Sequence, residues 1–194
     1  AVAECIKAGI RPVMITGDHK ITAAAIAKRI GILHDLSEAC EGADIENMSD
    51  EQLKEFVPNI SVYARVSPEH KIRIVRAWQE KGMIVAMTGD GVNDLLALRE
   101  ADCSIAIADG SDASRQIAQV VLMDSDFTHL PQVVMEGRKV IHNVTRTAGV
   151  FFIKTIYSVL VSIFCVLTNT PFPFIPIQIT LIDACIEAYP SFLT

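Results

Sequence analysis

Charged residues are scarce in this sequence. Asp, Glu, Lys and Arg make up 21% of the 194 residues, and the formal net charge is −6. The chain therefore offers no basic excess for binding nucleic acid. Its five cysteines are scattered and none forms a Cys-x-x-Cys pair, which argues against a zinc site or a disulfide framework and fits a reducing cytosol.

Charge is almost absent from the C-terminal part of the chain. Between Thr147 and Ile182, Lys154 is the only residue that is charged at neutral pH. Residues 148–167 form an apolar run of about twenty residues, which is long enough to cross a bilayer. A tight turn at 168–174 separates it from a second apolar segment. We expect a transmembrane hairpin, with the alternative of a buried hairpin in a soluble protein.

The remaining sequence alternates short apolar runs with helical patterns. This alternation predicts an α/β fold with a doubly wound parallel sheet, whose ligands bind at the carboxyl ends of the strands. A short helix capped by Ser49 is expected in the polar, acidic segment 35–58. The expected strands are 10–15, 60–63, 83–87, 104–107 and 120–122, and the other expected helices are 21–30, 68–81, 94–101 and 112–119.

The run Thr88-Gly89-Asp90-Gly91-Val92-Asn93-Asp94 carries the strongest chemical signal. It follows the apolar run Met83–Met87, which we interpret as a buried parallel strand. Asp90, Asn93 and Asp94 offer hard oxygen ligands within a short arc, and such ligands suit Mg²⁺. The bland alternative is an ordinary turn, because Gly-Asp-Gly and Asn-Asp are common turn formers.

A second strand-and-loop unit lies upstream. The apolar run at 10–15 ends in Thr16-Gly17-Asp18, and hydroxyl and N–H groups at a strand's carboxyl end form an anion site. Ser67 is expected to cap a helix that begins at Pro68, with Lys71 in its first turn. Because a cation there opposes the helix dipole, we interpret Lys71 as the partner of an anion, with a solvated lysine as the alternative.

Together these motifs resemble the second half of the phosphorylation domain of P-type ATPases, a haloacid-dehalogenase-like domain. The resemblance covers nearly the whole chain. It implies that Thr16, with Gly17 and Asp18, binds the phosphoryl group of an aspartyl phosphate, that Lys71 neutralises it, and that Asp90 and Asp94 hold Mg²⁺ with Asn93 in support. The motifs that carry it are Thr16–Asp18, Ala64–Pro68 with Lys71, Thr88–Asp94 and Glu136–Arg138.

The sequence also departs from the family pattern. Leu95–Leu98 replaces the usual Ala-Pro-Ala-Leu, and Ala108–Asp112 is more acidic than the usual glycine-rich turn, which indicates an atypical subfamily. The family's nucleophile is the Asp of Asp-Lys-Thr-Gly-Thr, a run that does not occur in these residues. We therefore expect the chain to be a fragment of a longer polypeptide that is inactive alone.

The second apolar segment contains Asp183 and Glu187, one helical turn apart, followed by Pro190. Carboxylates inside a membrane helix indicate a functional site, and a proline frees backbone carbonyls for a cation. The segment resembles the sixth transmembrane helix of P-type pumps. Further transport-site candidates on the preceding helix are Thr155 and Ser158, with Lys154 as a countercharge or as a lysine that reaches the interface.

The resemblance thus implies an ATP-driven cation pump that uses Mg²⁺ and ATP. Oxygen ligands favour calcium, with Mg²⁺, a monovalent cation or protons as alternatives; the rival class is a soluble or membrane-tethered haloacid-dehalogenase-like phosphatase. We expect a plasma-membrane protein that interacts with lipid, the transported cation and the other domains of its polypeptide, and with no nucleic acid. The expected parts are a cytosolic domain (1–130), a stalk helix (131–146) and the hairpin (147–194).

Overall fold

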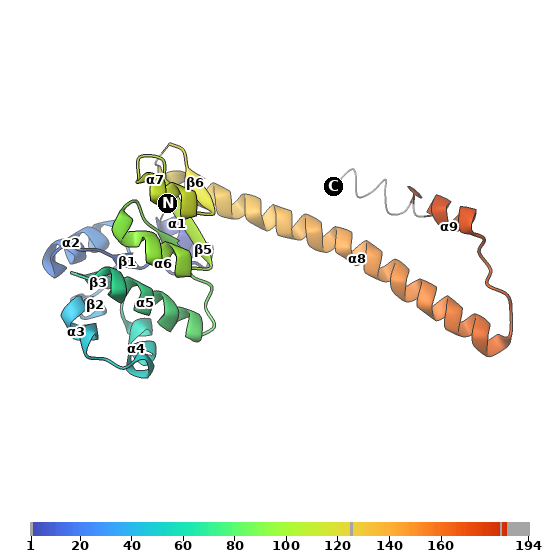
Figure 1. Cartoon of the computed structure of the whole chain (residues 1–194), viewed down its shortest axis with the longest axis horizontal. Coiled ribbons are helices and arrows are strands. Elements are labelled where there is room, and N and C mark those ends of the chain that lie inside the picture. The colour runs from blue at the N-terminus through green and yellow to red at the C-terminus, as the bar shows by residue number, and fades with distance from the viewer. Residues whose placement is uncertain (1, 125, 183, 186–194) are drawn as a thin grey trace. The chain divides into compact units, whose positions relative to one another are not determined.

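The computed structural model describes residues 2–124, 126–182 and 184–185. Residues 1–131 and 132–194 form two separate units. The first unit alternates strands and helices (Figure 1). Its elements are α1 (Val2–Lys7), β1 (Met14–Ile15), α2 (Lys20–Ile30), η1 (Leu36–Glu38), β2 (Ala39–Glu41), α3 (Gly42–Glu46), α4 (Asp50–Phe56), η2 (Val57–Asn59), β3 (Val62–Ala64), α5 (Pro68–Glu80), β4 (Ala86–Thr88), η3 (Val92–Asp94), α6 (Leu95–Glu100), β5 (Cys103–Ile107), α7 (Asp112–Ile117), β6 (Val120–Leu122) and η4 (Phe127–His129).

All strand pairs in this unit are parallel, as the sequence predicts, but the described strands form two sheets rather than one. One sheet has the order β1-β3-β2 and the other β4-β5-β6. The register pairs Ile15 with Tyr63 in the first sheet and Thr88 with Ile105 in the second. The two motif loops therefore leave from an edge strand in each sheet, β1 and β4.

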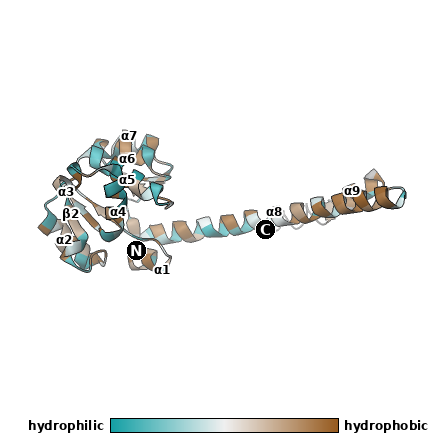
Figure 2. Cartoon of the chain, turned by 90° about the horizontal axis from the view of Figure 1, so that it is seen from below, coloured by the Kyte–Doolittle hydropathy of each residue, from teal (hydrophilic) through white to brown (hydrophobic). Residues whose placement is uncertain are grey.

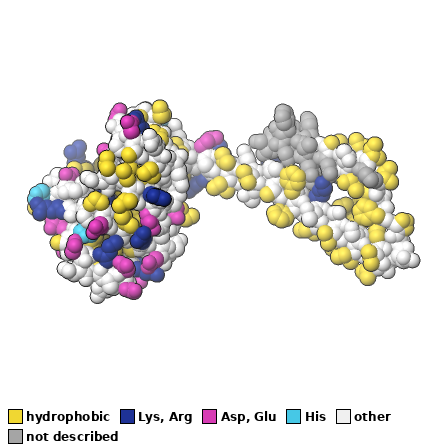
Figure 3. All heavy atoms as spheres, in the orientation of Figure 1, with side chains coloured by type: hydrophobic (Ala, Val, Ile, Leu, Met, Phe, Trp, Pro, Cys, Tyr) yellow, Lys and Arg dark blue, Asp and Glu magenta, His cyan; other side chains and the backbone are white. Residues whose placement is uncertain are grey.

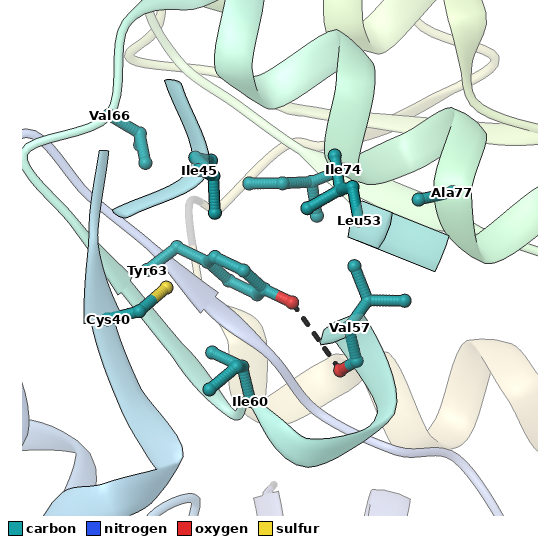
Figure 4. Packing of buried hydrophobic residues seen from close by; sticks show 9 residues of the cluster. All are labelled: Cys40, Ile45, Leu53, Val57, Ile60, Tyr63, Val66, Ile74 and Ala77. Atoms are coloured by element: carbon teal, nitrogen blue, oxygen red, sulfur yellow. Dashed lines mark hydrogen bonds between the residues drawn. The ribbon is translucent and has the colours of Figure 1, made fainter. Parts of the chain in front are cut away.

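Strand β3 is the centre of the first sheet and shows why the fold is doubly wound. Alternate residues of a strand face opposite sides of the sheet. Val62 and Ala64 pack with α2, whereas Tyr63 packs with α3, α4 and α5 on the other side. Tyr63 is fully buried, and its hydroxyl donates a hydrogen bond to the carbonyl oxygen of Val57 at 3.4 Å (Figure 4).

The helix boundaries follow the capping residues. Ser49 caps α4 in a reciprocal hydrogen-bonded pair with Gln52, as expected, and Ser67 caps α5. Helix α2 ends at Gly31, whose φ of 81° lies in the left-handed region that glycine adopts without strain. The sequence reading missed β2 and α3, two short elements within the acidic segment before α4.

The expectation of a buried strand over 83–87 is wrong in its first half. Strand β4 begins only at Ala86, and the Met83 and Ile84 side chains are exposed. The run lies at the edge of its sheet, so it has a parallel partner on one side only among the described strands. Strand 10–15 is likewise shortened to β1, and strand 60–63 shifts to β3.

The second unit consists mainly of α8 (Leu130–Thr168), followed by α9 (Pro176–Ile182). Within the described residues, α8 is the helix that is long and apolar enough to cross a membrane by length and composition. Its colours change from mixed to predominantly hydrophobic along its length (Figure 2), and apolar side chains are widely exposed on it (Figure 3).

The chain turns after α8. Asn169 adopts a left-handed conformation with φ of 51°, and the Thr170 N–H bonds the Cys165 carbonyl at 3.0 Å, which closes the helix end. The Phe174 ring then lies 6.3 Å from the Tyr157 ring on α8. The predicted turn at 168–174 is therefore present.

Candidate functional site: the loops at the strand ends

An ion pair joins the loop after β4 to helix α5. The Lys71 ammonium lies 2.5 Å from Oδ1 of Asp94, and both side chains are nearly buried, with exposed fractions of 13% and 11%. The second carboxylate oxygen, Oδ2, accepts a hydrogen bond from the Gly91 N–H at 3.3 Å. Lys71 therefore faces an anion, which compensates for its place in the first turn of a helix.

Gly89 makes room for this ion pair. A Cβ atom at this position would stand 2.5 Å from Cβ and 2.8 Å from Cγ of Asp94. Such contacts are sterically impossible, so any other residue would displace the Asp94 side chain. The glycine is thus required for close packing of the acidic loop against its own strand end.

The start of α5 is fixed from two sides. Ser67 accepts a hydrogen bond from the His70 N–H at 3.3 Å, and His70 Nδ1 accepts one from the Ser67 N–H at 3.2 Å. The other ring nitrogen, Nε2, lies 2.6 Å from a carboxylate oxygen of Glu46 in α3. The turn that carries Lys71 is therefore held by contacts that do not involve the ion pair with Asp94.

Thr16 belongs to the loop after β1. Its hydroxyl oxygen accepts a hydrogen bond from the Asp18 N–H at 3.1 Å, and its main chain bonds Tyr63 and Val66. The neighbouring loop contains Arg65, whose φ of 49° is unusual for a non-glycine residue and marks local strain. The Arg65 N–H donates to the Asp18 carbonyl at 3.0 Å, which ties the two loops together.

Asp90 is held by its backbone and exposed at its side chain. Its carbonyl oxygen accepts hydrogen bonds from the Ser111 N–H at 2.8 Å and from the Ser114 hydroxyl at 3.1 Å. Its carboxylate and the Asn93 side chain belong to exposed residues. The loop after β5 and the helix α7 that follows it therefore anchor the loop after β4.

This geometry separates the two carboxylates that the sequence assigns to Mg²⁺. Asp90 presents an exposed carboxylate on a fixed backbone, which fits an ion that keeps several waters and binds one or two carboxylates together with phosphate. Both oxygens of Asp94 already have partners, so here Asp94 orients Lys71. Among the described residues, no group of three or more His, Cys, Asp or Glu side chains could hold a metal. The Mg²⁺ assignments of Asp90 and Asp94 stay predictions.

Two further ionisable groups have shifted pKa values but lie outside the loops that carry the candidate site residues. The Asp102 carboxylate accepts a hydrogen bond from the Val85 N–H at 2.8 Å, just before β4, and this bond lowers the Asp102 pKa. Burial raises the pKa of Cys40 in β2 to about 12, so its thiol stays protonated at neutral pH. Cys40 is therefore a packing residue and a poor nucleophile.

The sequence did not predict the hydrogen bonds from Ser111 and Ser114 that hold the Asp90 backbone. Ser111 lies in the segment Ala108–Asp112, which the sequence marks only as an acidic departure from the family, and Ser114 lies in the helix expected over 112–119. The available signal was the Gly110-Ser111-Asp112 turn after an apolar strand, because a serine before a helix is a typical cap. The buried role of Ser114 has no signature in the sequence.

The proposed transport-site residues are only partly described. The Thr155 hydroxyl donates to the Phe151 carbonyl at 3.0 Å, one turn earlier in α8, and the Ser158 carbonyl accepts from the Ser162 hydroxyl at 2.8 Å. Lys154 is half-buried on the same helix. Asp183, Glu187 and Pro190 lie outside the described residues. The transport site stays a prediction.

Comparisons with known proteins address this fold and its loops. A family model described as haloacid dehalogenase-like hydrolase matches residues 1–102, just over half of the chain. The chain is 42% identical over 188 residues to a probable cation-transporting ATPase of Streptococcus pneumoniae, covering 93% of this chain and 24% of that protein. It is 39% identical over 192 residues to a calcium-transporting ATPase of Bacillus subtilis, covering 98% and 22%.

A solved structure shows the same fold. The zinc-transporting PIB-type ATPase in its E2.Pi state matches with a TM-score of 0.67 and 21% identity, covering 99% of this chain and 25% of that chain. The chain thus spans about a quarter of the length of the curated relatives it matches. The similarity extends beyond the hydrolase domain into the apolar segments.

Proposed function

The chain belongs to the haloacid dehalogenase-like hydrolase family, and we propose that it is the distal half of the phosphorylation domain of a P-type cation-transporting ATPase together with its adjoining membrane helices. The named relatives are cation- or calcium-transporting ATPases, and the similarity covers nearly all of this chain. We propose the parts 1–130 for the cytosolic domain, 131–146 for the stalk and 147–194 for the membrane hairpin.

The ion pair between Lys71 and Asp94 is the observation that carries this proposal. The nearly buried Lys71 ammonium of α5 contacts Asp94, which lies four residues after Asp90 in the loop that follows β4. Phosphoryl transfer depends mainly on positioning and on neutralising charge. Asp94 would hold the Lys71 ammonium in position to stabilise phosphoryl charge, and Asp90 would supply a carboxylate for the metal.

The reacting groups follow from this arrangement. The Thr16 hydroxyl, with the backbone at Gly17 and Asp18, would bind phosphoryl oxygens, because these atoms lie after a parallel strand where anions bind. When bound to Asp90, Mg²⁺ would stabilise charge on the transferring phosphoryl group of ATP. Lys71 would stabilise the same charge, and Asn93 would support the loop.

An aspartate from another segment of the polypeptide would accept the phosphoryl group. Among the described strands, β1 and β4 each have a partner on one side only. A strand that paired between them would deliver its carboxyl end to the loops that hold Thr16 and Asp90. We propose that the nucleophilic aspartate lies at the end of such a strand.

The membrane part supports transport over the rival activity. Helix α8 has 39 residues, and its apolar side chains are widely exposed rather than packed in a core. A soluble phosphatase rarely exposes so large an apolar surface, whereas a helix that crosses a membrane does. We propose that the protein resides in the plasma membrane with residues 1–146 in the cytosol, while a membrane-tethered Mg²⁺-dependent phosphatase is the second candidate.

The transported ion is proposed to be calcium. The candidate ligands Asp183, Glu187, Thr155 and Ser158 are oxygen donors, which suit a hard cation. The Bacillus subtilis relative is a calcium-transporting ATPase by name. Mg²⁺, monovalent cations and protons remain the alternatives, since Lys154 beside a carboxylate would also suit proton movement.

The test is phosphoenzyme formation by the full-length polypeptide that contains this chain. Wild-type protein with ATP and Mg²⁺ should form an acid-stable phosphoenzyme that hydroxylamine cleaves, as expected of an acyl phosphate. Asp90→Asn should abolish it, because a hard anionic metal ligand is lost. Wild-type phosphoenzyme levels in Asp90→Asn would overturn the metal assignment, and hydrolysis of small phosphate esters without ion dependence would favour the phosphatase.

A further inference from the structure

Ser114 is a fully buried hydroxyl that the proposed chemistry does not use. It lies in α7, its exposed fraction is 0%, and it is one of the few buried polar residues of the first unit. A buried hydroxyl is stable only when its hydrogen-bonding groups are satisfied. The partners of Ser114 therefore indicate what the residue does.

Those partners form a closed network. The Ser114 hydroxyl lies 3.1 Å from the Asp90 carbonyl oxygen, 2.8 Å from the Ser111 carbonyl oxygen and 2.7 Å from the Ser111 hydroxyl. Ser111 Oγ also accepts the Ser114 N–H at 3.1 Å. With the Ser111 hydroxyl as donor to Ser114, the Ser114 proton is shared between the two carbonyl oxygens, and every polar group in the network has a partner.

The network fixes one end of the Asp90 loop. The Asp90 carbonyl oxygen receives both the Ser111 N–H and the Ser114 hydroxyl, which satisfies its two lone pairs. Gly110 packs against the Asp90 backbone: a Cβ atom at Gly110 would stand 3.0 Å from the Asp90 carbonyl oxygen and 3.2 Å from the Asp90 Cα atom. The backbone of Asp90 is thus in contact with Gly110 and Ser111 of the loop after β5 and with Ser114 of α7.

We propose that Ser114 is a positioning residue for the metal ligand Asp90: its hydroxyl fixes the Asp90 backbone so that the exposed carboxylate meets Mg²⁺ in one orientation. This inference rests on the proposed function, in which Asp90 binds Mg²⁺. Groups that orient metal ligands typically contribute a factor of about 10–100 to metal affinity or activity. Ser114 acts through the backbone rather than through the carboxylate, so the lower end of that range applies.

Ser104 in β5, the strand that precedes Ser114 and α7 in the chain, provides a matched control variant. Ser104 in β5 is also buried, and its hydroxyl accepts a hydrogen bond from the Gln119 N–H at 3.1 Å. Ser104→Ala removes one buried hydroxyl from the same sheet without touching Asp90. Ser114→Cys is a second test variant, since its thiol fills the site but is a weak donor. Together these variants separate the loss of the Asp90 contact from a cavity or a general loss of stability.

The experiment uses the full-length polypeptide and two readouts. The first is the Mg²⁺ concentration that gives half-maximal phosphoenzyme, with ATP affinity measured separately; the second is the Mg²⁺-dependent rise of the unfolding temperature. Ser114→Ala and Ser114→Cys should raise the half-maximal Mg²⁺ concentration about tenfold in both readouts with unchanged ATP affinity. Ser104→Ala should keep the wild-type value.

Two results would overturn the inference in different ways. The first result is that Ser114→Ala and Ser104→Ala have the same half-maximal Mg²⁺ concentration as each other, while Asp90→Asn loses the Mg²⁺ response. In that case Ser114 does not position Asp90, and the proposed function stands. If Asp90→Asn itself keeps the wild-type Mg²⁺ response in both readouts, the metal role of Asp90 fails, and the inference about Ser114 fails with it.

Discussion

Replacing Lys71 with methionine should destabilise the first unit and block phosphoryl transfer for two separable reasons. The variant leaves the Asp94 carboxylate with an exposed fraction of 11% and without its partner at 2.5 Å. Removing one member of a buried ion pair costs about 3–5 kcal/mol, because the remaining charge is uncompensated. For a unit of the size of Ala1–Pro131, 1 kcal/mol corresponds to a shift of about 3–5 °C, so the unfolding temperature should fall by roughly 10–20 °C.

The double variant Lys71→Met/Asp94→Asn distinguishes the two reasons. It removes both charges, and the asparagine carbonyl can still accept the Gly91 N–H that Asp94 accepts now. Thermal unfolding of the full-length protein, followed at the transition of this domain, should therefore recover more than half of the loss. The rate of phosphoenzyme formation should not recover, because the cation that stabilises the phosphoryl charge is still absent.

Two results for the Lys71 variants would contradict this prediction. An unfolding temperature of Lys71→Met within about 2 °C of the wild type would show that the ion pair does not stabilise the loop. A double variant that regains phosphorylation as well as stability would show that Lys71 only balances Asp94 and takes no part in transfer. ATP affinity, measured by binding, should be nearly unchanged in each variant.

Three further predictions follow from single contacts. Gly110→Ala should push the Asp90 backbone aside, because the new methyl group meets two carbonyl oxygens at 3.0–3.1 Å, and should weaken Mg²⁺ dependence in phosphoenzyme assays. Asp102→Asn should lower the unfolding temperature at neutral pH. The hydrogen bond from the Val85 N–H lowers the pKa of Asp102, so the ionised carboxylate stabilises the folded state. The difference in unfolding temperature between wild type and Asp102→Asn should therefore narrow as the pH falls below 3.8 and the carboxylate becomes protonated. Asp183→Asn and Glu187→Gln should weaken ion-stimulated ATPase activity, with Glu187 having the larger effect, while phosphorylation by inorganic phosphate persists.

Each of these has a contradicting result. Wild-type Mg²⁺ dependence in Gly110→Ala would mean that the loop after β5 does not constrain Asp90. A constant stability gap between wild type and Asp102→Asn from pH 7 to below pH 3.8 would mean that ionisation of Asp102 is not what stabilises the start of β4. Unchanged ion dependence in both Asp183→Asn and Glu187→Gln would place the transport site elsewhere.

Local signals predicted much of the fold. Capping residues and glycine placed α2, α4 and α5 to within about one or two residues, because helix ends depend on side chains that are adjacent in sequence. The strand of residues 83–87 was misjudged because an apolar run does not reveal whether it lies at a sheet's edge or centre. Elements β2 and α3 were missed because a polar segment gave no periodic pattern.

The candidate site was predictable in its chemistry but not in its pairings. The family motifs identified Lys71, Asp90 and Asp94 as charged groups of one site. They did not show that Asp94 contacts the nearly buried Lys71 while Asp90 is exposed, because that difference depends on Gly89 and on the packing of this loop against helix α5, which is distant in sequence. The same limit applies to Ser114, whose contact with Asp90 joins residues 24 positions apart.

ATP-driven ion uptake by sealed membrane vesicles is the most direct test of the central claim. Vesicles containing the full-length wild-type polypeptide should accumulate Ca²⁺ when ATP and Mg²⁺ are added outside, and vesicles with Asp90→Asn should not. Uptake of another cation under the same conditions would change the proposed ion and keep the pump. Hydrolysis of phosphate esters by wild-type vesicles with no ATP-driven uptake of Ca²⁺, Mg²⁺, monovalent cations or protons would contradict the account and identify a phosphatase.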